Sequence, residues 1–324
     1  MRWLLGVLCL LAQLLGCAVP RTHGRFLAAV PHADAPLPPR TKIFLVAGGA
    51  DVANFAAEVV VQRRFWRARG YASDEVACYW AHPAGAAFRD DRSQYRELAA
   101  ELRACYPASP ALLREHLLQT SRRAPPFVYL YVSSHGRETL LPPGSMANSG
   151  MLPHEVALLD QSVIQLGSGV GRGSMFGALL VAMRRGADPD TLVLSPRILR
   201  DLLLAFPAAT RKFVVLQACH SGGFLADARP ARQADTLATV PALTAIASAR
   251  FDRTSFGCDS GAEMTYFGAA YQRLLAAHIG STHRVLDARG IDWVALFQRL
   301  SVEVAALERS VDVEASLPLM LRTP

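Results

Sequence analysis

The sequence predicts an α/β protein, a three-layer α/β/α sandwich with a mainly parallel central sheet. Short apolar runs of the kind that form strands covered on both faces recur along the chain, and helical segments separate them. The 324 residues are 51% hydrophobic and 19% charged, which is typical of a globular protein and excludes collagen-like, coiled-coil and wholly disordered chains. Because no internal repeat is visible, we expect a single domain.

The predicted elements alternate along the chain as in a parallel sheet. We expect strands at residues 43–47, 75–80, 127–133, 213–218 and 242–249. Helices are expected at residues 54–69, 94–105, 111–119, 196–206, 262–278 and 292–309. Gly70 is placed to end the first helix, and Ser195 with Pro196 is placed to begin the fourth.

The N-terminus has the pattern of a secretion signal. One basic residue, Arg2, precedes an apolar run of about a dozen residues that is too short for a stable membrane span. The sequence Leu-Leu-Gly before Cys17 resembles the lipobox of bacterial lipoproteins, in which the cysteine is lipid-modified; ordinary cleavage within residues 18–22 is the alternative. We therefore divide the chain into a signal (1–17), a Pro-rich linker (18–40) and one domain (41–324), exported to the periplasm and held at a membrane only through the lipid.

The formal charge of +7 does not predict nucleic-acid binding. Of the 34 basic residues 32 are Arg, and they are scattered along the chain without a recognisable nucleic-acid module. An arginine bias of this kind is typical of a GC-rich genome. No cluster of His, Cys or acidic residues has the spacing of a metal site, and the Gly-rich stretch at 167–173 does not match a nucleotide-binding loop, so we expect neither a metal nor a cofactor.

Two predicted strands run directly into chemically active residues. The strand at 127–133 is followed by Ser134-His135-Gly136, and the strand at 213–218 is followed by Cys219. Ligands of parallel sheets bind outside the carboxyl ends of the strands, so neighbouring strands would bring His135 and Cys219 to one edge. A thiol needs a positioned imidazole to act as a nucleophile toward a carbonyl.

Gly136 extends this interpretation. Without a Cβ atom there, a substrate carbonyl could approach the backbone, and the N–H groups of Gly136 and Cys219 could hold a developing oxyanion. The alternative for each residue alone is structural: Cys219 would be a small buried side chain, and His135 would be a loop histidine whose ring nitrogens are hydrogen-bonded within the protein. Their joint occurrence, each after an apolar strand and each followed by glycine within three residues, favours the functional interpretation.

These motifs resemble those of the legumain-like cysteine peptidases of the caspase-haemoglobinase fold. The resemblance covers about residues 42–275 and is carried by Val46-Ala47-Gly48 with Asn54, Ser134-His135-Gly136, the stretch from Gln217 to Gly222, the stretch from Asp252 to Cys258, and Thr265-Tyr266-Phe267-Gly268. It implies a cysteine endopeptidase acting on peptide or protein substrates, with Cys219 and His135 as the dyad and Asn54 orienting the imidazole. Asn54 is equally well placed to be the N-cap of the first helix.

The sequence departs from the family in the expected substrate pocket. Legumains have an Arg two residues after the orienting Asn and an acidic residue before the Ala-Cys pair, where this chain has Ala56 and Gln217. We therefore do not expect strict cleavage after Asn. The candidates for the pocket wall are Gln217, Ser255, Asp259 and Glu263. The alternative for Asp259 and Glu263 is a solvated position on the surface, outside the pocket.

Two further features leave alternatives open. His135 and Cys219 lie 84 residues apart, and the stretch between them contains an insertion at 137–191, which we interpret as a lid or partner-binding loop with a helix near 176–184, or as an insertion without function. Cys78 and Cys105 could form a disulfide in an oxidising compartment or stay as two buried thiols.

Three functions fit these observations. The first is hydrolysis of peptide bonds through a thioester acyl-enzyme. The second is a transamidase or ligase reaction on the same dyad, in which an amine replaces water. The third is a non-catalytic, lipid-tethered binding protein that has kept the fold.

Overall fold

We describe the protein from a computed structural model, which describes residues 42–49, 52–81, 92–139, 156, 160–167, 184–186, 194–226, 235–258, 263–279 and 291–324. The signal and linker predicted for residues 1–40, and the helix expected near 176–184 apart from Arg184, lie outside these residues. Most of the 137–191 insertion lies outside them as well.

A seven-stranded sheet forms the centre of the molecule, in the order β3-β2-β1-β4-β7-β8-β9. All neighbouring strands are parallel except β8 and β9, which are antiparallel. Its strands are β1 (Ile43–Ala47), β2 (Val76–Trp80), β3 (Tyr106–Pro107), β4 (Phe127–Ser133), β7 (Arg211–Gln217), β8 (Leu243–Ala247) and β9 (Leu319–Arg322). The five predicted strands are confirmed with small shifts at their ends, and β3 and β9 are additional strands at the two edges.

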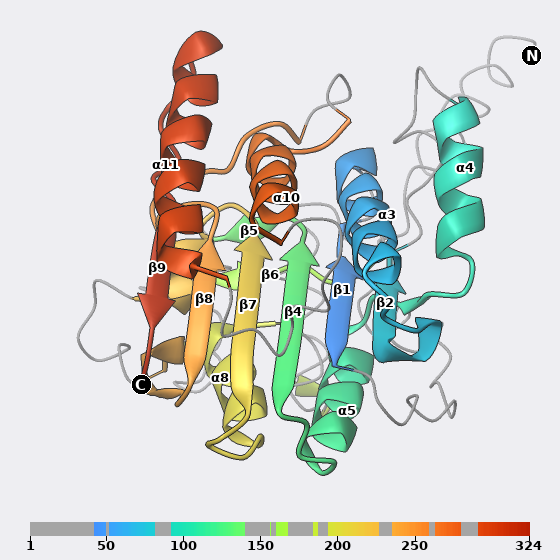
Figure 1. Cartoon of the computed structure of the whole chain (residues 1–324). Helices are drawn as coiled ribbons and strands as arrows, with labels where there is room; N and C mark the ends of the chain where they lie inside the picture. Colours follow the sequence, from blue (N-terminus) through green and yellow to red (C-terminus); the bar gives the residue numbers. More distant parts are fainter. Residues whose placement is uncertain are drawn as a thin grey trace, which may run out of the picture.

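Helices cover both faces of the sheet (Figure 1). On one face lie α3 (Ala53–Ala68), α4 (Arg92–Leu102), α10 (Tyr266–Ile279) and α11 (Trp293–Ser310), and on the other lie α5 (Pro110–Ser121) and α8 (Pro196–Leu204). Short 3-10 turns occur at η1 (Ser73–Glu75), η5 (Ser221–Phe224) and η6 (Leu237–Thr239). The predicted three-layer sandwich is therefore confirmed.

Two hydrophobic cores result from the alternation of side chains along each strand. Phe44 and Val46 of β1 point toward the core beneath α5 and α8, whereas Ile43, Leu45 and Ala47 point toward the core beneath α3, α10 and α11. All five side chains of β1 are buried. A strand buried on both faces reads as an unbroken apolar run, which is why this strand could be predicted from the sequence.

The ends of the helices follow local sequence signals. The hydroxyl of Ser195 accepts a hydrogen bond from the N–H of Ile198 at 3.4 Å, and Pro196 is the first residue of α8, as predicted. Gly70, which follows α3, has a φ of +83°, a conformation that glycine adopts readily. Asp292 caps α11 by accepting from the N–H groups of Val294 and Ala295.

A disulfide joins Cys78 in β2 to Cys105 just before β3, with 4.8 Å between the two Cα atoms. This resolves the alternative that the sequence left open for these two cysteines. In the part of the chain that the structure describes, no helix is both long and apolar enough to cross a bilayer.

Candidate active site

The carboxyl ends of β4 and β7 place two sequence motifs at the same edge of the sheet. The strands pair in parallel, with Ser133 opposite Gln217, and the N–H of Ser134 donates to the carbonyl oxygen of Gln217 at 3.0 Å. His135 and Cys219 are each two residues beyond this last pair, so both leave the sheet at one point. The expected pairing of the two strands is confirmed, and the catalytic roles of the two residues stay predictions.

Cys219 lies against the backbone of Ser255. The N–H of Ser255 donates to the Cys219 Sγ at 3.3 Å, and the Sγ–H faces the carbonyl oxygen of Ser255 at 3.6 Å. The thiol is half-buried. A backbone N–H directed at sulfur stabilises negative charge on it, so the segment at 253–258 is part of the thiol's environment.

His135 is held between the start of α3 and the loop after β1. Its ring packs edge-on against the ring of Phe55, with 5.1 Å between centroids and 87° between planes. A Cβ atom on Gly49 would come within 2.5 Å of the Phe55 ring and 3.3 Å of the His135 Cδ2 atom, so this glycine leaves room chiefly for the ring of Phe55, on which the imidazole packs. The carbonyl of His135 accepts from the N–H of Gln165 at 3.0 Å. These contacts fix the loop while leaving the residue half-exposed.

Asn54 does not cap the first helix. Val52 is the N-cap residue, with an extended backbone at φ −130° and ψ 129°, and Asn54 is the second residue of the helix with 1% of its surface exposed. The predicted capping role is therefore wrong, because α3 begins one residue earlier than the sequence indicated. The role of Asn54 in orienting the imidazole stays a prediction.

Gly136 is required for a different reason from the one predicted. A Cβ atom at this position would overlap the carbonyl oxygen of Cys219 and approach the side chain of Ala218 to 3.1 Å. The position of a side chain is thus filled by the protein's own backbone, and the role of the Gly136 N–H toward an oxyanion stays a prediction. The absence of a side chain lets the His135 loop and the Cys219 loop touch.

The three predicted pocket-wall residues that the structure describes, Gln217, Ser255 and Glu263, differ in exposure. Gln217 is 0% exposed and bonds to Ser133 and Ser255, so it lies beneath the site and cannot contact a substrate directly, which corrects that expectation. The side chain of Ser255 is nearly buried, and Glu263 is exposed. Asp259, like Cys17, lies outside the described residues.

A buried glutamate that the sequence analysis missed lies beneath the site. Glu58 of α3 is 0% exposed and accepts hydrogen bonds from the side chains of Tyr131, Ser133 and Thr265 and from the N–H of Thr265. Its burial raises the pKa of the carboxyl group above 4.5, and the hydrogen bonds oppose this effect. A signal was present in the sequence, because Glu58 shares the helical stripe of Phe55 and Val59 that faces the core.

Part of the long insertion is an ordered portion of the site. Residues 160–167 run beside the His135 loop, where β6 (Val163–Ile164) pairs antiparallel with β5 (Gly136–Arg137). The N–H of Gly167 donates to the carbonyl of Gly48 at 2.9 Å, and Val163 and Ile164 are buried. This segment supports the His135 loop, and the lid or partner-binding interpretation of the 137–191 insertion stays a prediction.

The neighbouring histidine and the second free cysteine have other surroundings. The Nδ1 atom of His220 lies 2.8 Å from the carbonyl oxygen of Phe251, and its backbone is left-handed with φ +58°. Cys258 is half-buried against the core beneath α3 and α10. The described residues contain no group of three or more His, Cys, Asp or Glu side chains that could hold a metal ion.

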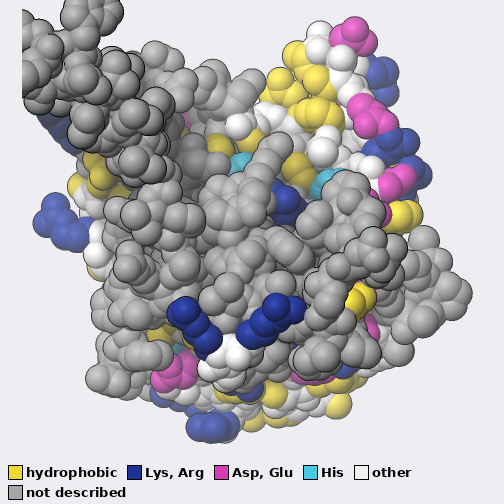
Figure 2. Space-filling view, turned by 180° about the vertical axis from the view of Figure 1, so that it is seen from behind, with side chains coloured by type: hydrophobic (Ala, Val, Ile, Leu, Met, Phe, Trp, Pro, Cys, Tyr) yellow, Lys and Arg dark blue, Asp and Glu magenta, His cyan; other side chains and the backbone are white. Residues whose placement is uncertain are grey.

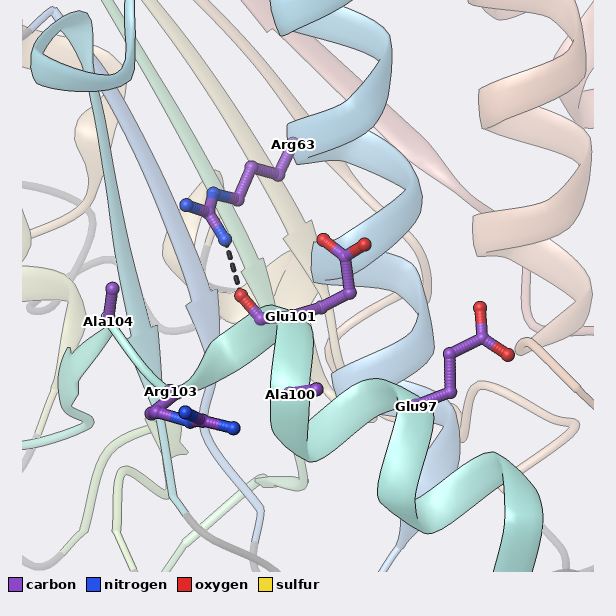
Figure 3. Close-up of a pocket in the computed structure, with 6 residues that line it drawn as sticks. All are labelled: Arg63, Glu97, Ala100, Glu101, Arg103 and Ala104. Carbon is purple, nitrogen blue, oxygen red and sulfur yellow. Dashed lines mark hydrogen bonds between the residues drawn. The ribbon is translucent and has the colours of Figure 1, made fainter.

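A surface groove of about 770 Å³ lies between α3 and α4 (Figure 3). It is lined by Arg63, Glu97, Ala100, Glu101, Arg103 and Ala104. The guanidinium of Arg63 bonds to the carbonyl oxygen of Glu101 across it. Arg63 is nine residues beyond Asn54, about 14 Å further along the helix axis, so the groove is separate from the candidate active site.

Basic side chains are scattered over the face of the molecule opposite to that of Figure 1. In Figure 2 the described Arg and Lys side chains stand apart from one another, and along the right-hand edge they alternate with acidic ones. Ion pairs also occur between helices, as between Arg273 of α10 and Glu303 of α11. Surface pairs of this kind contribute little to stability.

Comparisons with known proteins give similarities of fold. No family model matches the sequence, and no curated protein matches it. Among solved structures, the chain is similar to protein GSU0716 from Geobacter sulfurreducens, at 14% identity and a TM-score of 0.49, covering 88% of this chain and 94% of that one. It is also similar to caspase-1 from Spodoptera frugiperda, at 10% identity and a TM-score of 0.47, covering 92% and 91% of the two chains. Both scores are below 0.5, so the fold class rests on the sheet topology described above, and the legumain-like resemblance rests on the sequence motifs.

Proposed function

We propose that this protein is a cysteine endopeptidase that uses Cys219 as its nucleophile and His135 as its general acid and base. The observation that carries the proposal is the meeting of the two motifs at one sheet edge, where the loop of His135 touches the backbone of Cys219. The half-exposed thiol with the N–H of Ser255 directed at it supports the same function. The motif resemblance to the legumain-like peptidases adds to this support.

The reaction follows from the chemistry of these groups. The Cys219 sulfur attacks the carbonyl carbon of a peptide bond while His135 takes the thiol proton. The carbonyl oxygen becomes an oxyanion, which the N–H groups of Gly136 and Cys219 would hold. The C–N bond then breaks, His135 gives the proton to the leaving amine, and a thioester remains. Water hydrolyses the thioester, which releases the acid and restores the thiol.

The substrate is a peptide or protein without a strict requirement for Asn at the cleavage point. The positions at which legumains have an Arg and an acidic residue are occupied here by Ala56 and Gln217, which are 1% and 0% exposed. A site without polar partners for the substrate amide cannot compensate for its desolvation. Export and lipid attachment at Cys17 stay predictions from the sequence, as does the periplasmic location.

Covalent labelling tests the dyad. We expect a peptidyl electrophile such as a peptidyl acyloxymethyl ketone to modify Cys219, with no labelling at this position in Cys219→Ala and labelling reduced by about 100-fold or more in His135→Ala. His220→Asn is the matched control, because its imidazole faces the carbonyl oxygen of Phe251 and Asn tolerates the left-handed backbone. Mass spectrometry of the intact and digested protein gives the extent and position of labelling.

Two outcomes would contradict this function. If His135→Ala is labelled as fast as the wild type, the two residues do not act as a dyad. If a diverse peptide library gives no turnover while partner capture is the same for wild type and Cys219→Ala, the protein is a non-catalytic binding protein. Product analysis with an added amine separates transamidation from hydrolysis, because only transamidation joins the amine to the acyl group.

A further inference from the structure

Glu58 is a buried carboxyl group whose hydrogen-bond donors are all neutral among the described residues. The donors are the hydroxyl of Tyr131 at 2.7 Å, the hydroxyl of Ser133 at 2.6 Å, and the N–H and hydroxyl of Thr265 at 2.9 and 2.6 Å. Removing a carboxyl group from water is costly, and neutral donors compensate for this cost only in part. A residue this costly to bury is expected to serve a purpose that an apolar side chain could not.

The start of α10 lies directly on this carboxyl group. Thr265 precedes the helix, and its hydroxyl oxygen accepts from the N–H of Gly268 at 3.0 Å, which is the geometry of an N-cap. A Cβ atom on Gly268 would overlap the carboxyl group of Glu58, so the first turn of α10 has no space between itself and α3. Glu58 therefore contacts the start of α10, where the N–H of Tyr266 donates to the carbonyl oxygen of Phe256, the residue after Ser255, at 3.2 Å.

A second connection runs from Glu58 beneath the sheet edge to the thiol. The Ser133 hydroxyl oxygen lies 2.6 Å from Glu58 Oε2 and 2.9 Å from Gln217 Oε1. The amide nitrogen of Gln217 lies 3.4 Å from the hydroxyl oxygen of Ser255. The backbone of Ser255 contacts the sulfur of Cys219 through both its N–H and its carbonyl oxygen. We call Glu58, Ser133, Gln217 and Ser255 the buried polar chain.

The Ser133 hydroxyl makes this chain directional. It has one hydrogen and two oxygen neighbours, so it donates to one of them and accepts from the other. If Ser133 donates to Glu58, the NH2 group of Gln217 must face Ser133; if it donates to Gln217, Glu58 must carry a proton. A change at Glu58 therefore alters the hydrogen bonding of Gln217, and the amide of Gln217 is the partner of the Ser255 hydroxyl.

We propose that the buried polar chain positions the Cys219 thiol, with Glu58 as a positioning residue that acts through Ser133 and Gln217 on Ser255. This inference concerns the same site as the proposed function, and its importance for catalysis depends on Cys219 being the nucleophile proposed above. Glu58 does not touch the sulfur; it holds the backbone that does. Loss of the connection would let Ser255 shift and would weaken the N–H contact that stabilises the thiolate.

Two hydroxyl deletions on the same carboxyl oxygen give a matched test. Ser133→Ala breaks the buried polar chain, whereas Tyr131→Phe removes an equally buried hydroxyl from Glu58 Oε2 without touching Gln217. The measurement is the second-order rate constant for alkylation of Cys219 by iodoacetamide in the full chain, followed by site-resolved mass spectrometry. We expect Ser133→Ala to react about five- to tenfold more slowly than the wild type, the effect of one hydrogen bond, and Tyr131→Phe to stay within about twofold.

A double-mutant cycle separates positioning from general destabilisation. We expect Gln217→Ala to slow alkylation as Ser133→Ala does and the double variant to be no slower than either, because both substitutions break the same connection. Glu58→Gln should also slow alkylation, whereas Glu308→Gln should not; Glu308 is a buried glutamate of α11 that accepts from the N–H of Ser316. Melting temperatures are measured for every variant, so that each rate is taken where the protein is folded.

The proposal is overturned if Ser133→Ala and Tyr131→Phe change the rate equally, or if neither changes it. It is also overturned if the effects of Ser133→Ala and Gln217→Ala multiply in the double variant. Because iodoacetamide reports on the thiol alone, the result does not depend on peptide turnover. Failure of the proposed function would instead appear as unchanged labelling by the peptidyl electrophile in His135→Ala.

Discussion

At the scale of single residues, Gly136 has the tightest steric constraint at the site. The space next to its Cα atom is occupied by the carbonyl oxygen of Cys219, which is backbone and cannot rotate away. Its contact with this carbonyl joins the loops of the two candidate catalytic residues. The spacing of His-Gly after a strand could be read from the sequence, but the neighbour that excludes a side chain could not.

Gly136→Ala should therefore disrupt the site. We expect the free energy of unfolding to fall by about 1–3 kcal/mol, as in other overpacked sites, and the labelling of Cys219 to be lost with it. Gly186→Ala is a control with open space around its Cβ position and a φ of +82°, so it should cost about 1 kcal/mol from the backbone and leave labelling unchanged. Chemical denaturation and labelling kinetics measure the two effects; equal labelling in both variants would contradict the steric explanation.

His116 is a second residue whose surroundings only the folded chain defines. It is fully buried on α5, and its Nδ1 atom shares a hydrogen bond of 2.6 Å with the hydroxyl oxygen of Tyr79. Its Nε2 atom is buried without a hydrogen-bond partner among the described residues. Burial lowers the pKa of His116 from 6.5 to about 4, because the charged imidazolium would lose its hydration.

This lowered pKa predicts a loss of stability in acid. The His116 imidazole takes up a proton near pH 6.5 in the unfolded chain and only near pH 4 in the folded chain. The stability that the neutral, buried His116 contributes is therefore fully present above pH 6.5 and is lost as the pH falls toward 4. The free energy of unfolding that is lost over this pH range is roughly 3 kcal/mol. We expect His116→Phe to be less stable at neutral pH but to lose less stability between pH 6.5 and 4, as measured by urea denaturation. Parallel pH profiles for the two proteins would show that His116 does not contribute.

At the scale of secondary-structure elements, length and burial decide what could be predicted. β1 and β4 are continuous apolar strands buried on both faces, and their ends were predicted to the residue. β3, β5 and β6 have two residues each, which is too short for any periodic signal. The half-exposed strand β9 pairs antiparallel at the edge of the sheet, where it completes the bonding of β8.

The disulfide joins two of these elements and should contribute to their stability. Cys78 lies in the long strand β2, and Cys105 precedes the short edge strand β3, 27 residues later. Closing a loop of this length reduces the entropy of the unfolded chain by the equivalent of about 3.5 kcal/mol, and measured contributions are commonly about 2–4 kcal/mol. The free energy of unfolding of Cys78→Ala/Cys105→Ala should therefore be lower by about 2–4 kcal/mol, which chemical denaturation measures as a lower midpoint concentration of denaturant.

The same variant tests whether the disulfide affects the site. The two cysteines are on the β2 side of the sheet, away from the β4–β7 pair that positions His135 and Cys219. We expect the labelling of Cys219 to be unchanged under conditions in which the variant is folded. Equal denaturation midpoints for the wild type and the variant would show that the crosslink does not stabilise the chain.

At the scale of the whole molecule, the sheet brings distant parts of the chain to one point. His135 and Cys219 are 84 residues apart in the sequence and leave adjacent strands at the same edge. This meeting could be predicted, because parallel strands joined by a helix present their carboxyl ends on one side. The carboxyl ends of parallel strands lie at one edge of a sheet, so the few residues after the two strands were enough to predict where the site lies.

The support beneath the site follows no such rule. Glu58 lies on the helical stripe of Phe55 and Val59 that faces the core, but its hydrogen-bond partners come from other elements. Gln217 before Cys219 would be expected in the cleft, yet it is fully buried. Their burial depends on how closely α3 and α10 approach β4, which is set by Gly268 and by the packing of the whole layer. Contacts between elements are non-local, so local patterns carry little information about them.

The sequence by itself determined the five long strands, the six helices, the mainly parallel character of the sheet and the pair of residues that leaves it at one edge, because strand burial and helix ends are encoded in short stretches of chain. Only the tertiary structure decided that Gly136 makes room for the backbone of Cys219, that Gln217 lies beneath the site and that Glu58 is connected to Ser255. The physical reason is that the hydrogen-bond partner of a buried polar group is chosen by the packing of layers, which brings together residues from different elements.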